Sequence, residues 1–158
     1  MDARWKPNVT VAAVIERDGR FLLVEEETPD GLQINQPAGH LEYGESLLAA
    51  VARETREETA HAFVARHLLG IYLAPGPSPV TYLRFAFTGE LGEQIAGQRL
   101  DAGIQRILWL SPEEIRAQRA RHRSPLLERC VDDYLGGQRF DLALLYSHPA
   151  LAGGQGNT

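Results

Sequence analysis

The stretch that decides the fold runs from Asn35 to Phe63 and reads NQPAGHLEYGESLLAAVARETREETAHAF. Its second half contains RETREE, from Arg53 to Glu58, which places three carboxylates within six residues of a predicted helix. Glu54 and Glu58 stand one turn apart on that helix, and like charges at this spacing cost about 0.2–0.5 kcal/mol. The acidic helix and the Gly-containing turn before it are therefore the first candidate site.

The three carboxylates lie on one side of the predicted helix. At about 100° per residue, Glu54, Glu57 and Glu58 fall within one arc of roughly 100°. This arc borders the apolar one, which contains Leu47, Leu48, Val51 and Thr55. Two charges about 5–6 Å apart, at an effective dielectric near 20, repel by about 3 kcal/mol. A hard divalent cation removes this repulsion, so the pattern favours a Mg²⁺ site, with Mn²⁺ as the other suitable ion.

A solvated helix face held by ion pairs is the alternative interpretation. Arg53 and Glu57 stand one turn apart and could pair. No lysine or arginine lies one turn beyond Glu54 or Glu58, which a face stabilised by ion pairs would normally show. On the helix alone both interpretations stay open. Gly39, six residues before Glu45, adds a position where the backbone can approach a ligand closely and present its carbonyl oxygen to a cation.

Predicted strands and helices alternate along the rest of the chain. Apolar runs, and turn signals such as Asp18-Gly19 between the first two, predict strands at Val9–Ile15, Phe21–Val24, Phe63–Leu73, Val80–Thr88 and Ile104–Leu110. Residues 25–33 and 89–103 are polar and are predicted as loops. Helices are expected after the capping serines Ser46, Ser111 and Ser124. This order predicts an α/β fold with a mixed β-sheet between helices, one domain over residues 1–148 and a flexible tail over 149–158.

Composition and charge narrow the function classes. The chain has 158 residues, of which 44% are hydrophobic, enough for one domain with a real core. Its net charge of −5 argues against binding a nucleic acid polymer but permits a phosphate-bearing small molecule with a divalent cation. Cys130 is the only cysteine, which excludes an intrachain disulfide and a Cys-based metal site. No signal peptide or membrane span is apparent, so we expect a cytoplasmic protein without a membrane partner.

The segment that begins at Gly39 resembles the Nudix box, the signature of a hydrolase family. Six fixed positions of that pattern match at the right spacing, namely Gly39, Glu45, Arg53, Glu54, Glu57 and Glu58. Thr55 replaces an aliphatic residue, and Ala60 replaces the closing glycine, which normally takes a left-handed conformation. Flanking stretches, among them KPNVTVAAVIERDGRFLLVEE, are similar to a bacterial subgroup that acts on nucleotides and thiamine-pyrimidine pyrophosphate.

The resemblance implies an α/β/α sandwich and Mg²⁺-dependent hydrolysis of small pyrophosphates with release of phosphate. It implies that the carbonyl of Gly39 and the carboxylates of Glu54, Glu57 and Glu58 hold the metal. One of these acids, or a later one, would orient or deprotonate the attacking water. The candidates for the later acid are Glu90, Glu93 and Asp101. Glu45 and Arg53 are expected to pair and to hold the turn against the helix.

Six further residues are candidates for substrate binding. Arg84 shares a strand face with Tyr82, and a guanidinium suits phosphate, although half-exposed strand arginines are common. Asn35, Gln36 and His40 flank the Gly turn, and turn chemistry alone would explain Asn35. Trp5 could stack on a heterocycle and Lys6 could meet a phosphate; a terminal Trp that covers the core edge is the alternative.

Three functions are compatible with this pattern. The first is a pyrophosphohydrolase of modest selectivity. The second is a narrower enzyme, either a nucleotide-sanitising one or a nucleoside-diphosphate-sugar pyrophosphatase. The third is a non-catalytic module that senses a nucleotide. The box is the same in such proteins while the substrate loops differ, so it does not decide among them. A monomer and a homodimer are both compatible with the sequence.

Overall fold

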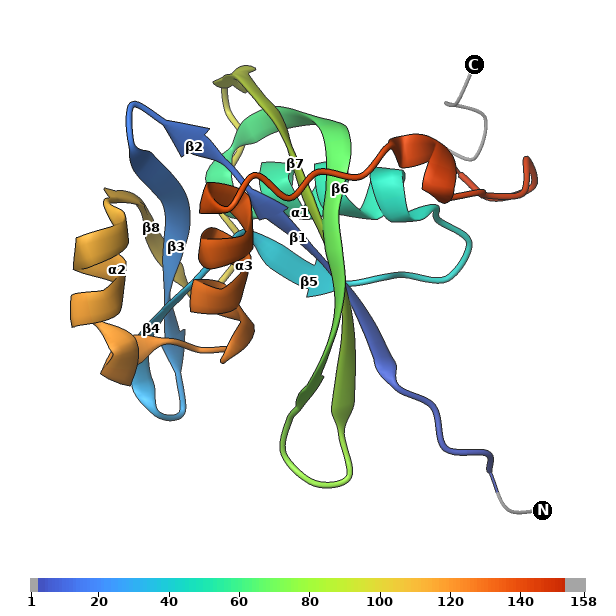
Figure 1. Cartoon of the computed structure of the whole chain (residues 1–158), viewed down its shortest axis with the longest axis horizontal. Helices are drawn as coiled ribbons and strands as arrows, with labels where there is room; N and C mark the ends of the chain where they lie inside the picture. The colour runs from blue at the N-terminus through green and yellow to red at the C-terminus, as the bar shows by residue number, and fades with distance from the viewer. Residues whose placement is uncertain (1–2, 153–158) are drawn as a thin grey trace.

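Two β-sheets form the centre of the computed structural model, which describes residues 3–152 (Figure 1). The first sheet has the strand order β5-β1-β7-β6. Its strands are β1 (Asn8–Val14), β5 (Ala38–His40), β6 (His61–Pro75) and β7 (Thr81–Gln94). β1 and β7 run parallel, whereas β1 with β5 and β6 with β7 run antiparallel. The predicted mixed sheet is therefore confirmed.

The second sheet is antiparallel and is built around β3. It contains β2 (Glu16–Arg17), β3 (Arg20–Thr28), β4 (Gly31–Asn35) and β8 (Ile104–Leu110). The hairpin predicted for Val9–Ile15 and Phe21–Val24 is wrong in part, because only the short β2 pairs with β3 at this turn. Residues 11–14 are buried on both sides, and this part of β1 pairs with two strands of the first sheet instead.

Two predicted loops are strands over part of their length. Residues 25–33 form the arms of the β3–β4 hairpin, in which Glu25 pairs with Ile34. Their polarity suggested a loop, but Glu25 is only 5% exposed because Arg106 and Arg121 neutralise its carboxylate. The predicted loop at 89–103 starts later, since β7 continues to Gln94 and pairs with the beginning of β6.

The helices are α1 (Leu47–Thr59), α2 (Pro112–Ala117) and α3 (Leu126–Leu135), with short 3₁₀ helices η1 (Arg119–Arg121) and η2 (Leu142–Leu144). Helices α1 and α2 begin where the capping signals predict, whereas α3 begins one residue later than predicted, with Pro125 instead of Ser124 at the cap position. Ser46 Oγ accepts from Ala49 N at 3.1 Å, and Ser111 Oγ accepts from Glu114 N at 3.2 Å. Each cap satisfies a backbone donor that the first turn of a helix leaves free, which contributes about 1 kcal/mol.

The first sheet lies between α1 and α3, which confirms the α/β/α sandwich. Alternate residues of β1 point to opposite faces, so Ala12 and Val14 join the cluster that includes Cys130 of α3. Val11 and Ala13 join the other cluster, which includes Val51 of α1. Full burial of a large aliphatic side chain contributes about 1.5–3 kcal/mol. The two apolar clusters thus fix α1, which carries the acidic residues, on one face of the sheet.

The chain after α3 crosses β6 and ends beside the start of α1 (Figure 1). Leu68 N donates to Phe140 O at 2.9 Å, and Phe140 N donates to Leu68 O at 2.8 Å, which covers part of the β6 edge. Ser46 N donates to Ala152 O at 2.9 Å. Residues 153–158 of the predicted tail lie outside the described residues, so its flexibility stays a prediction. Among the residues that the structure describes, no helix has the length and apolar character needed to cross a bilayer.

Candidate active site

An acidic cluster stands at the last two turns of α1. One carboxylate oxygen from each of Glu54, Glu57 and Asp101 lies within 4.8 Å of the other two. Asp101 comes from the loop between β7 and β8, and its backbone N–H donates to Glu57 O at 2.9 Å. Among the three candidates for the later acid, the structure therefore brings Asp101 to the helix. Glu90 instead forms an exposed ion pair with Arg66, and Glu93 is exposed on β7.

The cluster fits a hard divalent cation. Burial raises the pKa of Glu54, and the neighbouring charges of Glu57 and Asp101 raise it further, although Arg53 acts in the opposite direction. A cation among the three carboxylates would remove this unfavourable interaction, and an all-oxygen donor set is what Mg²⁺ and Mn²⁺ prefer. The three side chains differ in burial, with Asp101 the most exposed, so the cluster is reachable from solvent.

Gly39 on β5 makes room for this cluster. A Cβ built on Gly39 would overlap Cδ and both carboxylate oxygens of Glu54. Only glycine therefore leaves room for the Glu54 carboxylate in this position. This close approach is the physical reason for a glycine at the head of the motif, while the carbonyl of Gly39 stays a predicted ligand.

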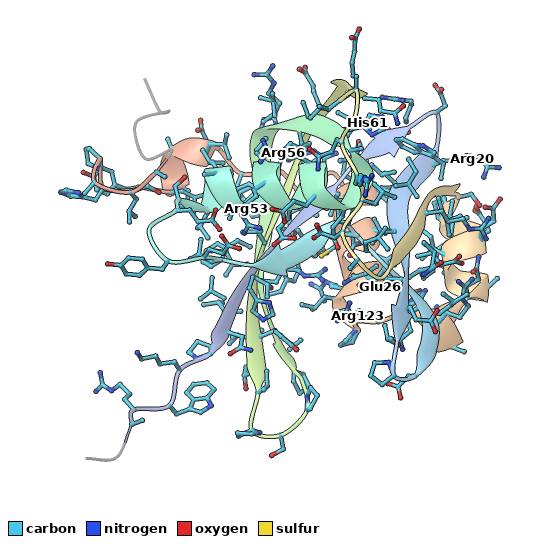
Figure 2. The ribbon with its side chains drawn as sticks, turned by 180° about the vertical axis from the view of Figure 1, so that it is seen from behind. Arg20, Glu26, Arg53, Arg56, His61 and Arg123 are labelled. Carbon is cyan, nitrogen blue, oxygen red and sulfur yellow. The ribbon has the colours of Figure 1, made fainter. Side chains whose placement is uncertain are left out.

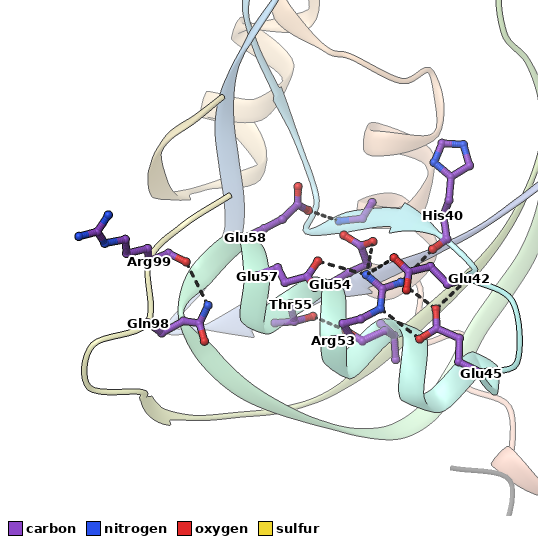
Figure 3. Close-up of polar contacts among 12 residues, drawn as sticks. His40, Glu42, Glu45, Arg53, Glu54, Thr55, Glu57, Glu58, Gln98 and Arg99 are labelled. Atoms are coloured by element: carbon purple, nitrogen blue, oxygen red, sulfur yellow. Dashed lines mark hydrogen bonds and ion pairs between the residues drawn. The ribbon is translucent and has the colours of Figure 1, made fainter. Parts of the chain in front are cut away.

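Arg53 connects the turn before α1 to the acids on it, as Figure 3 shows. Its guanidinium binds Glu45 through two hydrogen bonds, Nη2 to Oε1 at 2.7 Å and Nε to Oε2 at 3.1 Å. Nη1 also contacts Glu54 at 2.8 Å and Glu57 at 3.1 Å, and Nη2 donates to the backbone oxygen of His40 at 3.0 Å. The Glu45–Arg53 pair is thus present. The ion-pair interpretation of the helix also holds in part, since Arg53 balances two of its carboxylates.

Glu58 is the most buried acid of the motif. Its side chain reaches around to β5, where Ala38 N donates to Oε1 at 2.7 Å (Figure 3). Burial raises the pKa of Glu58 to about 8, and the charges of Glu54 and Asp101 contribute in the same direction. Glu58 is not one of the three acids that converge, although the sequence pattern grouped it with Glu54 and Glu57. It lies instead on the wall of the adjoining cleft.

A cleft of about 480 Å³ opens between the β3–β4 hairpin, the β6–β7 hairpin and the start of α3. Four of the six residues predicted to bind substrate line it, namely Asn35, Gln36, His40 and Arg84. Trp5 and Lys6 do not. Trp5 Nε1 donates to Pro79 O at 3.1 Å, so its ring rests on the β6–β7 loop, and Lys6 is exposed. The structure therefore separates these two residues from the other four.

The sequence offered no signal for two pairs on the cleft wall. Glu26 on β3 and Arg123 before α3 form an ion pair although they are far apart in the chain, and Figure 2 shows them side by side. The rings of His40 and Tyr82 lie 6.3 Å apart, tilted by 59°. Strand register brings these two together, because Asn8 of β1 pairs with Tyr82 and Thr10 pairs with His40. Such contacts depend on the tertiary fold.

Arg84 forms part of the cleft floor and is only 4% exposed. Its Nη1 donates to Gln36 Oε1 at 3.0 Å, and its Nη2 donates to Asn35 Oδ1 at 3.4 Å. Both acceptors are uncharged amides. The half-exposed arginine that the sequence allowed as an alternative is therefore a buried one, and it lines the same cleft as Gly39 and Glu58.

Comparison with known proteins decides the family. A NUDIX domain profile matches residues 5–130, which includes every residue of the acidic cluster. The chain belongs to the Nudix family. It is 40% identical over 141 residues to phosphatase NudJ of Escherichia coli K12, an alignment that covers 89% of this chain and 92% of that protein. The same values hold for phosphatase NudJ of Shigella flexneri.

A solved structure shows the same fold in a similar protein. A NUDIX hydrolase from Nitrosomonas europaea superposes with a TM-score of 0.86 at 50% identity, over 90% of this chain and 98% of that one. The protein is thus a NudJ-like Nudix hydrolase, an enzyme that acts on pyrophosphate-type bonds. Nudix hydrolases generally use divalent metals, which agrees with the acidic cluster on α1.

Proposed function

We propose that the protein is a Mg²⁺-dependent hydrolase of phosphoanhydride bonds that releases inorganic phosphate from small pyrophosphates. Its substrates would include nucleoside diphosphates and triphosphates and compounds of the thiamine-pyrimidine pyrophosphate type. One observation carries this proposal: a cluster of three carboxylates stands next to a cleft with a buried arginine on its floor. The similarity to phosphatase NudJ supports phosphate as the released product.

Four groups would hold the cation. They are the carboxylates of Glu54, Glu57 and Asp101 and the carbonyl of Gly39. A bound Mg²⁺ (or Mn²⁺) supplies charge neutralisation at phosphoryl oxygens and makes hydroxide accessible near neutral pH. Arg53 would keep Glu54 and Glu57 in place, because one nitrogen of its guanidinium contacts both carboxylates. Glu45 would in turn hold Arg53 through its two hydrogen bonds.

The side chains on the cleft wall would bind the substrate and accept the proton of the attacking water. Arg84 would bind a phosphoryl group, since its guanidinium faces the cleft with only amide partners. Glu58 is held by Ala38 N through Oε1, and its Oε2 would accept a proton from the attacking water when the carboxyl, whose pKa burial raises to about 8, is ionised. The water oxygen then bonds to phosphorus, the bridging P–O bond breaks, and the electron pair of that bond leaves with the departing phosphate group.

A broad substrate range follows if most of the binding affinity comes from contacts with the phosphates. The protein carries a net charge of −5, so the cation and a few basic groups such as Arg84 must bind the phosphates. These groups contact what all pyrophosphates share and leave the organic part to the His40 and Tyr82 rings, which accept any flat ring. We therefore expect several small substrates and no nucleic acid polymer.

A substrate panel tests this function. Nucleoside diphosphates, nucleoside triphosphates and thiamine-type pyrophosphates are incubated with Mg²⁺, and inorganic phosphate is measured against pyrophosphate. We expect several substrates to yield phosphate. Turnover of a single substrate with release of pyrophosphate would instead favour the nucleotide-sanitising enzyme. Nucleotide binding without any turnover would favour the sensing module.

A further inference from the structure

Arg84 is a buried cation without a counter-charge. Among residues 3–152 no carboxylate forms an ion pair with it, and its three polar neighbours are Gln36, Asn35 and the thiol of Cys130. A buried charge of this kind is costly unless an opposite charge is supplied. Arg84 nevertheless lines the cleft, so an anion that enters the cleft can supply that charge.

Gln36 has no free polar group with which to bind a substrate. It is only 1% exposed, its Nε2 donates to Leu127 O at 2.9 Å, and its Oε1 accepts from Arg84 at 3.0 Å. The bond to Leu127 fixes the amide so that its oxygen, and not its nitrogen, faces the guanidinium. Gln36, in the connection between β4 and β5, thereby links α3 to Arg84 on β7. The sequence pattern predicted a substrate contact here, whereas the structure shows a contact with Arg84.

We propose that Gln36 is a positioning residue that holds Arg84 through a neutral acceptor, so that the full charge of the guanidinium stays available to a phosphoryl oxygen. A glutamate has nearly the same shape and would also accept from Arg84. It would form a buried ion pair, however, and a substrate phosphate would then have to displace a carboxylate. The uncharged amide keeps the orientation of Arg84 without neutralising it.

The strand register brings this anion subsite next to the acidic cluster. Thr10 of β1 pairs with Arg84 on one side and with His40 on the other, and the next residue of β1, Val11, pairs with Gly39. Arg84, Gly39 and Glu58 line the same cleft. A diphosphate with one phosphoryl group at the acidic cluster would thus have its second phosphoryl group in the part of the cleft that Arg84 lines. The inference rests on the proposed function in one respect, namely that the anion is a substrate phosphate.

Gln36→Glu tests the inference, with Gln33→Glu as its matched control. Gln33 lines the same cleft but bonds Thr28 instead of Arg84, so both variants add one negative charge to the cleft and only one changes the partner of Arg84. We expect Gln36→Glu to raise the KM for ADP about tenfold or more, with kcat within about threefold of the wild type. Gln33→Glu should change KM by less than about threefold. Equal effects of the two variants would overturn the proposal.

A double-mutant cycle separates action through Arg84 from direct contact with substrate. In an Arg84→Met background, Gln36→Glu should change the KM by less than about twofold, because the group it acts on is gone. A full effect in that background would show that Gln36 acts independently of Arg84 and would contradict the proposal. Gln36→Met provides the same test if the glutamate variant does not fold, with an expected rise in KM of about threefold or more.

Binding of α,β-methylene-ADP, measured by calorimetry with Mg²⁺, distinguishes this inference from the proposed function. Carbon replaces the bridging oxygen in this compound, so it binds without being hydrolysed. We expect the Kd to rise about tenfold for Gln36→Glu and to change little for Gln33→Glu. If ADP is not hydrolysed but this pattern appears, the function fails and the role of Gln36 stands. If ADP is hydrolysed but Gln36→Glu binds the compound as the wild type does, the role of Gln36 fails.

Discussion

The carboxylate of Glu54 fills the space that a side chain on Gly39 would need. The Glu54 carboxylate can therefore keep its place in the acidic cluster only because residue 39 has no Cβ. Residue 39 thus lies against a carboxylate of the cluster in which one oxygen from each of Glu54, Glu57 and Asp101 lies within 4.8 Å of the other two. The glycine and the acids, fifteen or more residues apart in the sequence, thus form one site.

Gly39→Ala should inactivate the enzyme without unfolding it. The added methyl overlaps the end of a flexible side chain, so the Glu54 carboxylate can move away from the cluster at small cost in stability. We expect kcat to fall about 10²-fold while the Tm changes by only a few degrees. Gly92→Ala is the control, because the three atoms nearest to its new methyl would all belong to Ala62, the closest being Cβ at 3.1 Å and the next the backbone oxygen at 3.4 Å. Wild-type activity in Gly39→Ala would show that the position of Glu54 does not matter.

Removal of divalent metal should abolish turnover, and it should also change stability. Mg²⁺ binds the folded protein alone, so it should raise the Tm of the wild type measured by calorimetry. The same addition should have little effect on Glu57→Gln or Asp101→Asn, each of which removes one carboxylate from the cluster. Glu90→Gln and Glu93→Gln should respond as the wild type does. An equal response of Asp101→Asn and the wild type would exclude Asp101 as a ligand.

Glu45→Gln should lower stability in a pH-dependent way. Hydrogen bonds from Arg53 lower the pKa of Glu45 below its ordinary value of 4.5 despite the opposing effect of burial. A lowered carboxyl pKa stabilises the folded state above pH 4.5, and this stabilisation is lost as the pH falls through the folded-state pKa. We expect a loss of about 1–3 kcal/mol in the free energy of unfolding at pH 7 that shrinks below pH 4. A loss that is constant from pH 7 to pH 3 would contradict the role of the ion pair.

Ala60→Gly should stabilise the protein. Ala60 ends α1 in the left-handed conformation, with φ 60° and ψ 26°, which costs an L-residue with a Cβ about 1–2 kcal/mol. Glycine avoids that cost but adds entropy to the unfolded chain. The net gain in the free energy of unfolding should be about 0.5–1 kcal/mol, measured by chemical denaturation. Ala52→Gly, in the middle of the same helix, should instead lose about 0.5–1 kcal/mol.

Local patterns in the sequence predicted what local physics controls. The start of α1 after Ser46 and the position of Glu54 and Glu57 on one side of the helix both depend on residues within a few turns. Polar strands were missed for the opposite reason. Glu25 can lie in a buried strand only because Arg106 and Arg121, about eighty or more residues away, neutralise it.

The same distinction applies to the site. Spacing placed Glu54 and Glu57 together, but the choice of Asp101 over Glu90 and Glu93 depends on how the loop after β7 folds back onto α1. Sequence spacing also could not show that Gln36 faces Arg84 rather than the substrate, since the two residues are 48 positions apart and meet only in the folded chain. The residue types of the site were thus predictable, and their partners were not.

The most direct measurement is the release of inorganic phosphate from ADP by the wild type and by Glu57→Gln, each with Mg²⁺ and with excess EDTA. The account predicts that the wild type with Mg²⁺ releases phosphate and AMP in equal amounts. It predicts no release in EDTA. It also predicts that kcat of Glu57→Gln falls by about 10²-fold or more, because that variant lacks one carboxylate of the metal cluster. Wild-type rates in EDTA, or an undiminished rate in Glu57→Gln, would contradict a metal-dependent hydrolase built on this acidic cluster.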